Sequence, residues 1–245
     1  MEKFSFYDFL GLLLPGVIFV FFANIINNLY GVYPILFEAV DWKVSISILL
    51  CFALIIGAVL YTSNFYLTNK TKWYNQLFGM YKHVACLYLK MKFLHQLMNK
   101  ILNKKAKKWY GKNIFFNNKD FEKLNNNEQK DVKDLQDEYY DRMYYELEYI
   151  SKIENAKAFQ SFYFFFRQTT LACILLLILG IVLQLLSLFS FFSLKTPETN
   201  SILWLAALLI ILLFISIQLA RWYRKRMVMK MYWAYFTHLN QNLNN

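Results

Sequence analysis

Four long stretches without Asp, Glu, Lys, Arg or His constrain the fold of this 245-residue chain more than any other feature. They cover residues 9–37, 44–69, 168–194 and 199–220. About 20 apolar residues cross the hydrocarbon core of a membrane as a helix, so each stretch is long enough to span it. The chain is therefore expected to be an all-α, polytopic membrane protein with four transmembrane helices.

The first stretch is predicted to be a permanent span rather than a signal peptide. Lys3 is the only basic residue before it, and no small-x-small cleavage pattern follows. The expected spans cover about 9–30, 44–67, 168–194 and 201–220.

The distribution of basic residues predicts the orientation. All Lys and Arg except Lys43 and Lys195 lie in segments 1–8, 63–168 and 221–245. Because Lys and Arg near span ends favour the cytoplasmic side, both termini and the middle segment are expected there. The formal charge of +11 and a composition rich in Asn and Lys fit a multi-pass protein of a bacterial inner membrane.

The middle segment is predicted to form a cytoplasmic antiparallel helical hairpin, a coiled-coil stalk. Leu77, Val84, Met91 and Met98 follow one another at heptad spacing. Residues 63–119 hold twelve Lys and no acid, whereas residues 120–168 have a net charge of −4, so the two arms attract each other. We expect the arms to continue straight from the second and third spans, with Asn127 as the N-cap of the returning helix.

These patterns divide the chain into four predicted parts. They are an N-terminal transmembrane hairpin (1–67), the cytoplasmic helical hairpin (68–166, turn at about 103–127), a C-terminal transmembrane hairpin (167–222) and a basic cytoplasmic tail (223–245).

The opening stretch FYDFLGLLLPG combines a cap with a helix breaker. Ser5 and Asp8 fit a capping box at the start of the first helix. Pro15 cannot donate to the carbonyl of Gly11, so the helix is expected to bend there, and Gly11 and Gly16 allow a neighbouring backbone to approach. The alternative is functional: Asp8 would form an acidic ring at a pore mouth, and the bend would act as a gate.

Two basic clusters are candidate contact sites. The first, a candidate contact for a protein partner or nucleic acid, consists of Lys104, Lys105, Lys107, Lys108 and Trp109. A solvated or lipid-facing cluster is the alternative, but an upright stalk would hold these residues about 60 Å from the lipid headgroups. The second, a predicted membrane-interface anchor, consists of Arg167, Arg221, Arg224, Lys225 and Arg226.

No pattern in the chain predicts enzymatic chemistry. The three histidines are scattered, the three cysteines form no CxxC pair, and nucleotide-binding and nucleophile motifs are absent from the sequence. We therefore expect no catalytic residue, cofactor, metal or small-molecule substrate.

The pattern Tyr7-Asp8-x-Leu10-Gly11-x-x-x-Pro15-Gly16, followed by two spans, a long helical insertion and two more spans, resembles a group of small bacterial membrane proteins. These are the membrane effectors and accessory proteins of antiphage systems, including the membrane accessory proteins of type VI-B CRISPR systems. The resemblance implies oligomerisation, membrane permeabilisation and tuning of an RNA-guided nuclease. The arginine-histidine signature of HEPN ribonucleases, which some members carry, is missing from this chain.

Two functions are expected from these observations. The first is a homo-oligomeric, pore-forming or membrane-perturbing effector or accessory protein of an antiphage system. The alternative is a non-conducting scaffold or regulator that recruits a soluble protein or RNA through its basic cytoplasmic stalk. In both, membrane lipids surround the spans.

Overall fold

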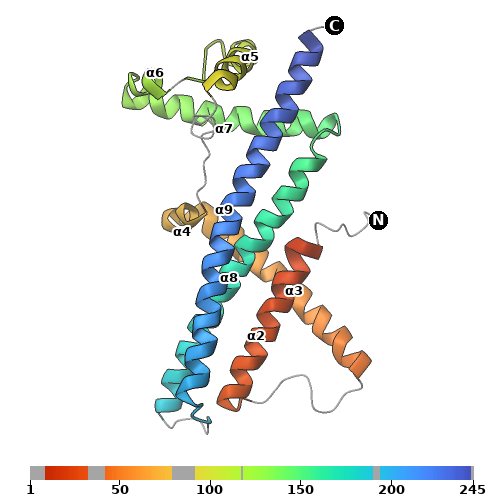
Figure 1. The fold of residues 1–245 in the computed structure, drawn as a ribbon, viewed down its shortest axis with the longest axis vertical. Coiled ribbons are helices and arrows are strands. Elements are labelled where there is room, and N and C mark those ends of the chain that lie inside the picture. The colour runs from red at the N-terminus through yellow and green to blue at the C-terminus, as the bar shows by residue number, and fades with distance from the viewer. Residues whose placement is uncertain (1–8, 33–41, 79–91, 117, 190–193, 244–245) are drawn as a thin grey trace. The chain divides into compact units, whose positions relative to one another are not determined.

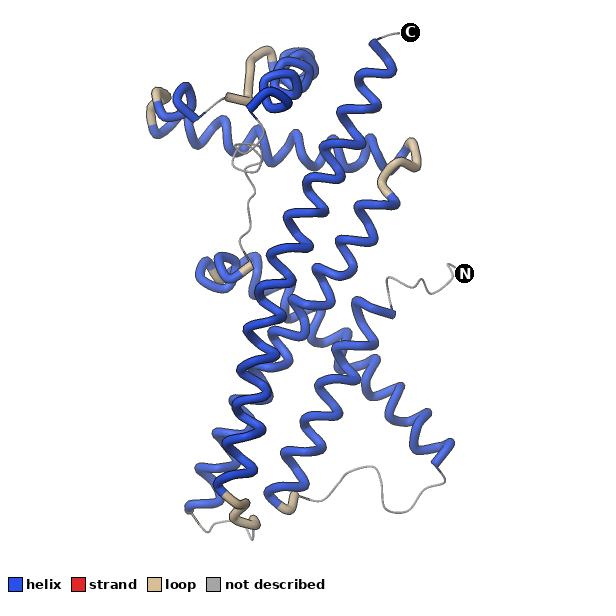
Figure 2. The backbone as a smooth tube through the Cα atoms, viewed as in Figure 1, coloured by secondary structure: helices blue, strands red, loops and turns tan. Residues whose placement is uncertain are grey.

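The computed structural model describes residues 9–32, 42–78, 92–116, 118–189 and 194–243. Throughout these residues the regular structure is helical (Figures 1 and 2). The elements are a π-helical turn η1 (Phe9–Leu13), α2 (Leu14–Tyr30), α3 (Trp42–Lys70), α4 (Lys72–Leu77), α5 (Lys92–Tyr110), α6 (Asn118–Glu122), α7 (Asn126–Tyr149), α8 (Glu154–Leu188) and α9 (Thr199–Leu243).

Four of these helices are long and apolar enough to cross a membrane, as the sequence predicts. The apolar segments are Gly11–Tyr30, Ser47–Lys70, Ala156–Leu188 and Thr199–Gln241. The last two exceed the length that a bilayer requires: α9 has 45 residues and is therefore about 67 Å long, against a hydrocarbon core of about 30 Å.

The chain divides into two compact units. The membrane unit comprises Met1–Gly79 and Gln160–Tyr223, and the polar unit comprises Met80–Phe159 and Arg224–Asn245. Helices α8 and α9 contribute residues to both units.

In the membrane unit, η1 and α2 cross α3 at two glycines. A Cβ atom added to Gly16 would lie 1.8 Å from the carbonyl oxygen of Ala53, and one added to Gly57 would lie 1.8 Å from that of Leu12. Only glycine permits backbones to approach this closely. Gly16 therefore admits the close approach that the sequence suggests, while a Cβ on Gly11 would meet no atom of the described residues within 4 Å.

Pro15 changes the winding of the first helix. The chain is π-helical from Phe9 to Leu13 and becomes α-helical at Leu14, so Pro15 lies in the first turn of α2. Proline has no N–H to donate to the preceding turn, and its position coincides with the change from π-helical to α-helical winding. Ser5 and Asp8, the predicted cap, lie outside the described residues.

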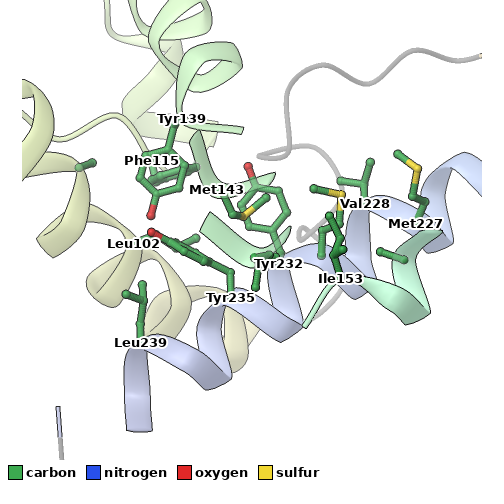
Figure 3. Close-up of a cluster of buried hydrophobic side chains, with 14 of the residues drawn as sticks. Leu102, Phe115, Tyr139, Met143, Ile153, Met227, Val228, Tyr232, Tyr235 and Leu239 are labelled. Carbon is green, nitrogen blue, oxygen red and sulfur yellow. The ribbon is translucent and has the colours of Figure 1, made fainter. Parts of the chain in front are cut away.

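The polar unit has one apolar cluster built by α5, α7 and the ends of α8 and α9 that belong to it (Figure 3). Helix α5 contributes Leu102 and Ala106, and α7 contributes Tyr139, Met143 and Leu147. The buried side chains of α9 in this cluster are Met227, Val228, Met231, Tyr232, Tyr235 and Leu239. The segment predicted to be a basic tail is thus largely helical and packed, because one of its faces is apolar.

The predicted continuous arms are interrupted at two points. Helix α3 ends at Lys70, since Thr71 has an extended backbone. Helix α7 ends at Tyr149, where Ser151 takes a left-handed conformation (φ 56°) and Lys152 N–H donates to the Leu147 carbonyl. This second break allows Ile153 to join Leu147 in the apolar cluster.

The start of α7 differs from the prediction by two residues. Asn125, not Asn127, is the N-cap: its side chain accepts from Glu128 N–H, and the Glu128 carboxylate accepts from Asn125 N–H. Val84 and Met91, half of the heptad series, lie at 79–91, outside the described residues, so the coiled-coil stalk stays a prediction.

Candidate functional site

The loop 111–116 in the polar unit is held in place by two amide side chains. Asn103 Oδ1 accepts from the N–H groups of Ile114 (3.0 Å) and Phe115 (2.9 Å), and its Nδ2 donates to the Phe115 carbonyl (2.7 Å). Gln136, which is buried on α7, donates from Nε2 to the Ile114 carbonyl at 2.6 Å. These hydrogen bonds satisfy buried backbone groups of the loop, which have no partners in a regular helix.

The end of α5 turns the chain into this loop. Gly111 has a φ of +71°, and its N–H donates to the Lys107 carbonyl at 2.9 Å. A left-handed glycine of this kind is a common helix terminator, because other residues pay a steric cost for positive φ. The turn brings Asn113 back beside the lysine-rich face of α5.

Five side chains line a hollow of about 380 Å³ at this place. Lys100, Asn103, Lys104 and Lys107 come from α5, and Asn113 comes from the loop. The three lysines follow the i, i+4, i+7 spacing and therefore share one helix face. We call this set the basic hollow.

The three lysines of the basic hollow differ from their lysine neighbours in their ion pairing. Within the described part of the chain they make no ion pair, whereas Lys105 pairs with Glu146 (3.0 Å) and Lys112 pairs with Asp131. Three ammonium groups around one hollow repel each other, and an anionic ligand would remove this repulsion. The arrangement suits phosphate groups, which lysine binds as a point charge.

The structure divides the predicted cluster 104–109. Lys104 and Lys107 line the basic hollow, and Lys108 is exposed outside its lining. Lys105 lies instead 3.0 Å from Glu146 and over the Trp109 ring, at 5.0 Å from its centroid.

Trp109 is not a free stacking platform. Its ring packs 5.1 Å from that of Tyr139 and lies under the Arg142 guanidinium. Lys100, Asn103 and Asn113 were not predicted as site residues. Lys100 could have been found from its spacing to Lys104, but the two asparagines depend on the fold of the loop.

The five residues of the predicted interface anchor occupy different environments. Arg221 donates from Nε to the Leu77 carbonyl at the end of α4 (2.6 Å), and Arg224 lies 6.0 Å from the Tyr140 ring centroid. Lys225 and Arg226 are exposed, as an anchor requires. Arg167 is 3% exposed and is enclosed by the membrane unit.

A second polar cluster surrounds this arginine. Asn64 donates from Nδ2 to the Arg167 carbonyl at 2.8 Å, which ties α3 to α8. Within α3, the Thr68 hydroxyl donates to the Asn64 carbonyl at 2.6 Å. Gln168, Thr169 and Thr170 are also buried. The sequence places these residues at the edge of a span but does not show that they face the interior.

Among the described residues, His, Cys, Asp and Glu side chains do not gather in groups of three that could hold a metal ion. Comparisons with protein-family models, with curated proteins and with solved structures find no match for this chain.

Proposed function

We propose that this protein is a multi-pass membrane protein that recruits a polyanionic partner, RNA first among the candidates, through the basic hollow. The observation that carries the proposal is the convergence of Lys100, Lys104 and Lys107, unpaired among the described residues, on one face of α5 beside Asn103 and Asn113. Amide side chains add hydrogen bonds to phosphate or sugar oxygens, while the ammonium groups neutralise phosphate charge.

Binding to RNA is tested on the full-length protein in detergent. Fluorescence polarisation of a labelled single-stranded RNA of 20 nucleotides measures the Kd of the wild type and of the triple variant K100Q/K104Q/K107Q. The variant is expected to bind about tenfold or more weakly, because three phosphate contacts are lost. The slope of log K against log salt should become shallower by about 2, or about 0.7 for each contact.

The matched control separates the basic hollow from general charge. K130Q/K225Q/K230Q removes the same three charges from exposed positions of the polar unit. It should retain most of the affinity and the steep salt dependence. Equal losses in both triple variants, or no RNA binding by the wild type, would refute recruitment through the hollow.

We also propose a second candidate, the formation of a pore or another perturbation of the membrane by several copies. It is supported by polar groups inside the membrane unit: both amide atoms of Gln168 and the Ser216 hydroxyl are buried and have no hydrogen-bond partner among the residues that the structure describes. Buried polar atoms of this kind are commonly satisfied by internal water, which a conducting path needs. Four helices of one chain leave little room for such a path, so conduction would require a homo-oligomer.

Inducible expression with a membrane-potential dye tests the pore. Wild-type protein is expected to depolarise the cells, and Gln168→Leu, which removes a polar group from the interior, is expected to weaken this effect. Gln218→Leu makes the same change at an exposed position of α9 and should behave like the wild type. Cells that stay polarised at wild-type expression, with the protein in the membrane, would exclude the pore.

The setting proposed for both candidates is antiphage defence in a bacterial inner membrane, with the polar unit and both termini in the cytoplasm. It rests on the architectural resemblance and on the positive-inside distribution of Lys and Arg. A cysteine introduced at Lys130 should react with a membrane-impermeant maleimide only after the cells are permeabilised. Plating of phage on cells with and without the protein tests the defensive role. Equal plating efficiency on both would refute that role.

A further inference from the structure

Arg167 is a buried cation that lacks a counter-ion within the described residues. Its Nε and Nη2 atoms have no hydrogen-bond partner, and Nη1 reaches the Tyr163 hydroxyl only at 3.5 Å. The guanidinium lies over the rings of Tyr163 and Phe164, with centroid distances of 5.3 and 5.1 Å. Ring contacts offset only part of the several kcal/mol that removing a charge from water costs.

Among the described residues, the polar side chains near this guanidinium are uncharged. Tyr74 of α4 is buried; its hydroxyl lies near the Asn64 side chain but makes no hydrogen bond of good geometry to the described residues. Burial raises the pKa of Tyr74, although the nearby Arg167 charge opposes the rise, so the hydroxyl keeps its proton at neutral pH. The amide of Gln168, the next residue of α8, is also unsatisfied.

We infer that Arg167 and Tyr74 bind a phosphoryl group, from a phospholipid headgroup or from free phosphate. The guanidinium presents N–H groups in a planar fork that matches two oxygens of a phosphate, and the Tyr74 hydroxyl adds a third donor. A phosphoryl group supplies the negative charge that these uncharged side chains lack, and oxygen acceptors for the unpartnered N–H groups of Arg167. The inference does not depend on the basic hollow, which belongs to the polar unit.

The surrounding aromatic residues place this site at the depth of lipid phosphates. Trp73, next to Tyr74, is 60% exposed, and Trp222, next to Arg221, is 46% exposed. Exposed tryptophans at the ends of membrane helices are typical of the headgroup level. Tryptophans at this level would place the site at the depth of phospholipid phosphates.

Helix α4 covers the site. Tyr74 and Phe78 pack with Tyr163 and Phe164, the two rings beneath the guanidinium. Arg221 holds the other end of α4 through the Leu77 carbonyl. Because the unpartnered atoms of Arg167 have almost no accessible surface, a phosphoryl group reaches them when this six-residue helix moves aside.

The test measures thermal unfolding of the full-length protein in dodecyl maltoside, after its lipids have been removed. Inorganic phosphate, added at constant ionic strength, is expected to raise the wild-type unfolding midpoint by about 3 °C or more. Arg167→Gln should abolish this rise, and Arg167→Lys, which keeps the charge without the fork, should retain part of it. Lys70→Gln removes an exposed charge at the end of α3 and should respond like the wild type.

Two lipid arms distinguish the sources of the phosphoryl group. Phosphatidylglycerol and a galactolipid without phosphate are added separately to the same micelles. A rise with phosphatidylglycerol that exceeds the rise with free phosphate assigns the site to a headgroup, and the reverse order assigns it to free phosphate. The galactolipid should raise the unfolding midpoints of the wild type and of Arg167→Gln by the same amount, or not at all.

The inference fails if neither phosphate nor phosphatidylglycerol changes the difference in unfolding midpoint between the wild type and Arg167→Gln. It also fails if Arg167→Gln is as stable as the wild type in every condition, since a neutral side chain would then serve equally well. Asp8 lies outside the described residues. If Asp8→Asn abolishes the phosphate response, or lowers stability as Arg167→Gln does without ligand, an internal carboxylate is the counter-ion instead.

Discussion

At the scale of single residues, glycine and buried polar side chains decide how the membrane unit packs. The sequence indicates that Gly16 can admit a neighbouring backbone, but it does not identify Gly57 or Ala53 as the partners. The sequence also does not distinguish Gly16 from Gly11, since either glycine could allow a neighbouring backbone to approach. The difference arises because Gly16 faces the Ala53 carbonyl of α3, whereas Leu12 rather than Gly11 meets α3 in the preceding turn.

The first prediction concerns this crossing. Gly16→Ala should destabilise the protein by about 1–3 kcal/mol, because the added methyl overlaps the Ala53 carbonyl and forces the helices apart. Thermal unfolding in detergent measures the effect. Gly180→Ala is the control, since a Cβ there meets no atom within 4 Å; a Gly16→Ala midpoint equal to that of Gly180→Ala would contradict the close packing.

The second prediction concerns Tyr139, a buried tyrosine of α7. Burial raises its pKa above the ordinary value of 10.0, and the neighbouring Tyr235, Glu146 and Tyr110 add to this rise. Because the folded-state pKa is the higher one, the stability contribution is complete below about pH 10 and is lost as pH rises further.

Tyr139→Phe should remove a slope of about 1.4 kcal/mol per pH unit from the alkaline loss of stability. Urea unfolding of the wild type and the variant between pH 9 and 11 measures the difference. Tyr149→Phe changes a side chain that is 90% exposed and should leave the slope unaltered. Parallel pH profiles for wild type and Tyr139→Phe would show that the tyrosine ionises freely in the fold.

At the scale of elements, the periodicity of apolar residues predicts that a helix is present more reliably than it predicts where the helix ends. The four spans and the apolar faces of α5 and α7 follow from hydrophobic pattern, but the breaks at Thr71 and Ser151 do not. Neither break carries proline or glycine, the usual signals. Each depends on tertiary packing that favours a new helix direction.

The third prediction concerns the loop between α5 and α6. Asn103→Ala should leave α5 helical but release the loop 111–116, because three hydrogen bonds to Ile114 and Phe115 are lost. Hydrogen exchange of the amides of Ile114 and Phe115 should accelerate, and RNA affinity should fall if the basic hollow is the site. Asn126→Ala at the exposed start of α7 is the control; unchanged exchange in Asn103→Ala would show that Gln136 alone holds the loop.

At the scale of the whole molecule, the end of α9 is a structural part of the polar unit. The basic run Arg224, Lys225 and Arg226 at its start makes it look like a solvated tail in sequence. The apolar positions from Met227 to Leu239 recur every three or four residues, and they are buried against α5 and α7.

The fourth prediction follows from this packing. Deletion of residues 224–245 should unfold the polar unit, since its apolar cluster loses the α9 side chains, while the spans still insert. Limited trypsin digestion in detergent should then cleave α7 rapidly. Deletion of residues 242–245 only, beyond the cluster, should leave α7 protected, and comparable cleavage in both truncations would contradict a packed α9 end.

The sequence by itself determines that this chain is helical and has four segments able to cross a membrane, because hydrophobic length and the lack of charge are local properties. It also identifies part of the lysine face of α5. Only the tertiary structure separates Lys104 and Lys107 from the paired Lys105, buries Arg167 among aromatic rings and makes the C-terminal segment part of a core. Those outcomes depend on which side chains meet across helices that lie far apart in sequence, and the pattern within one helix does not contain that information.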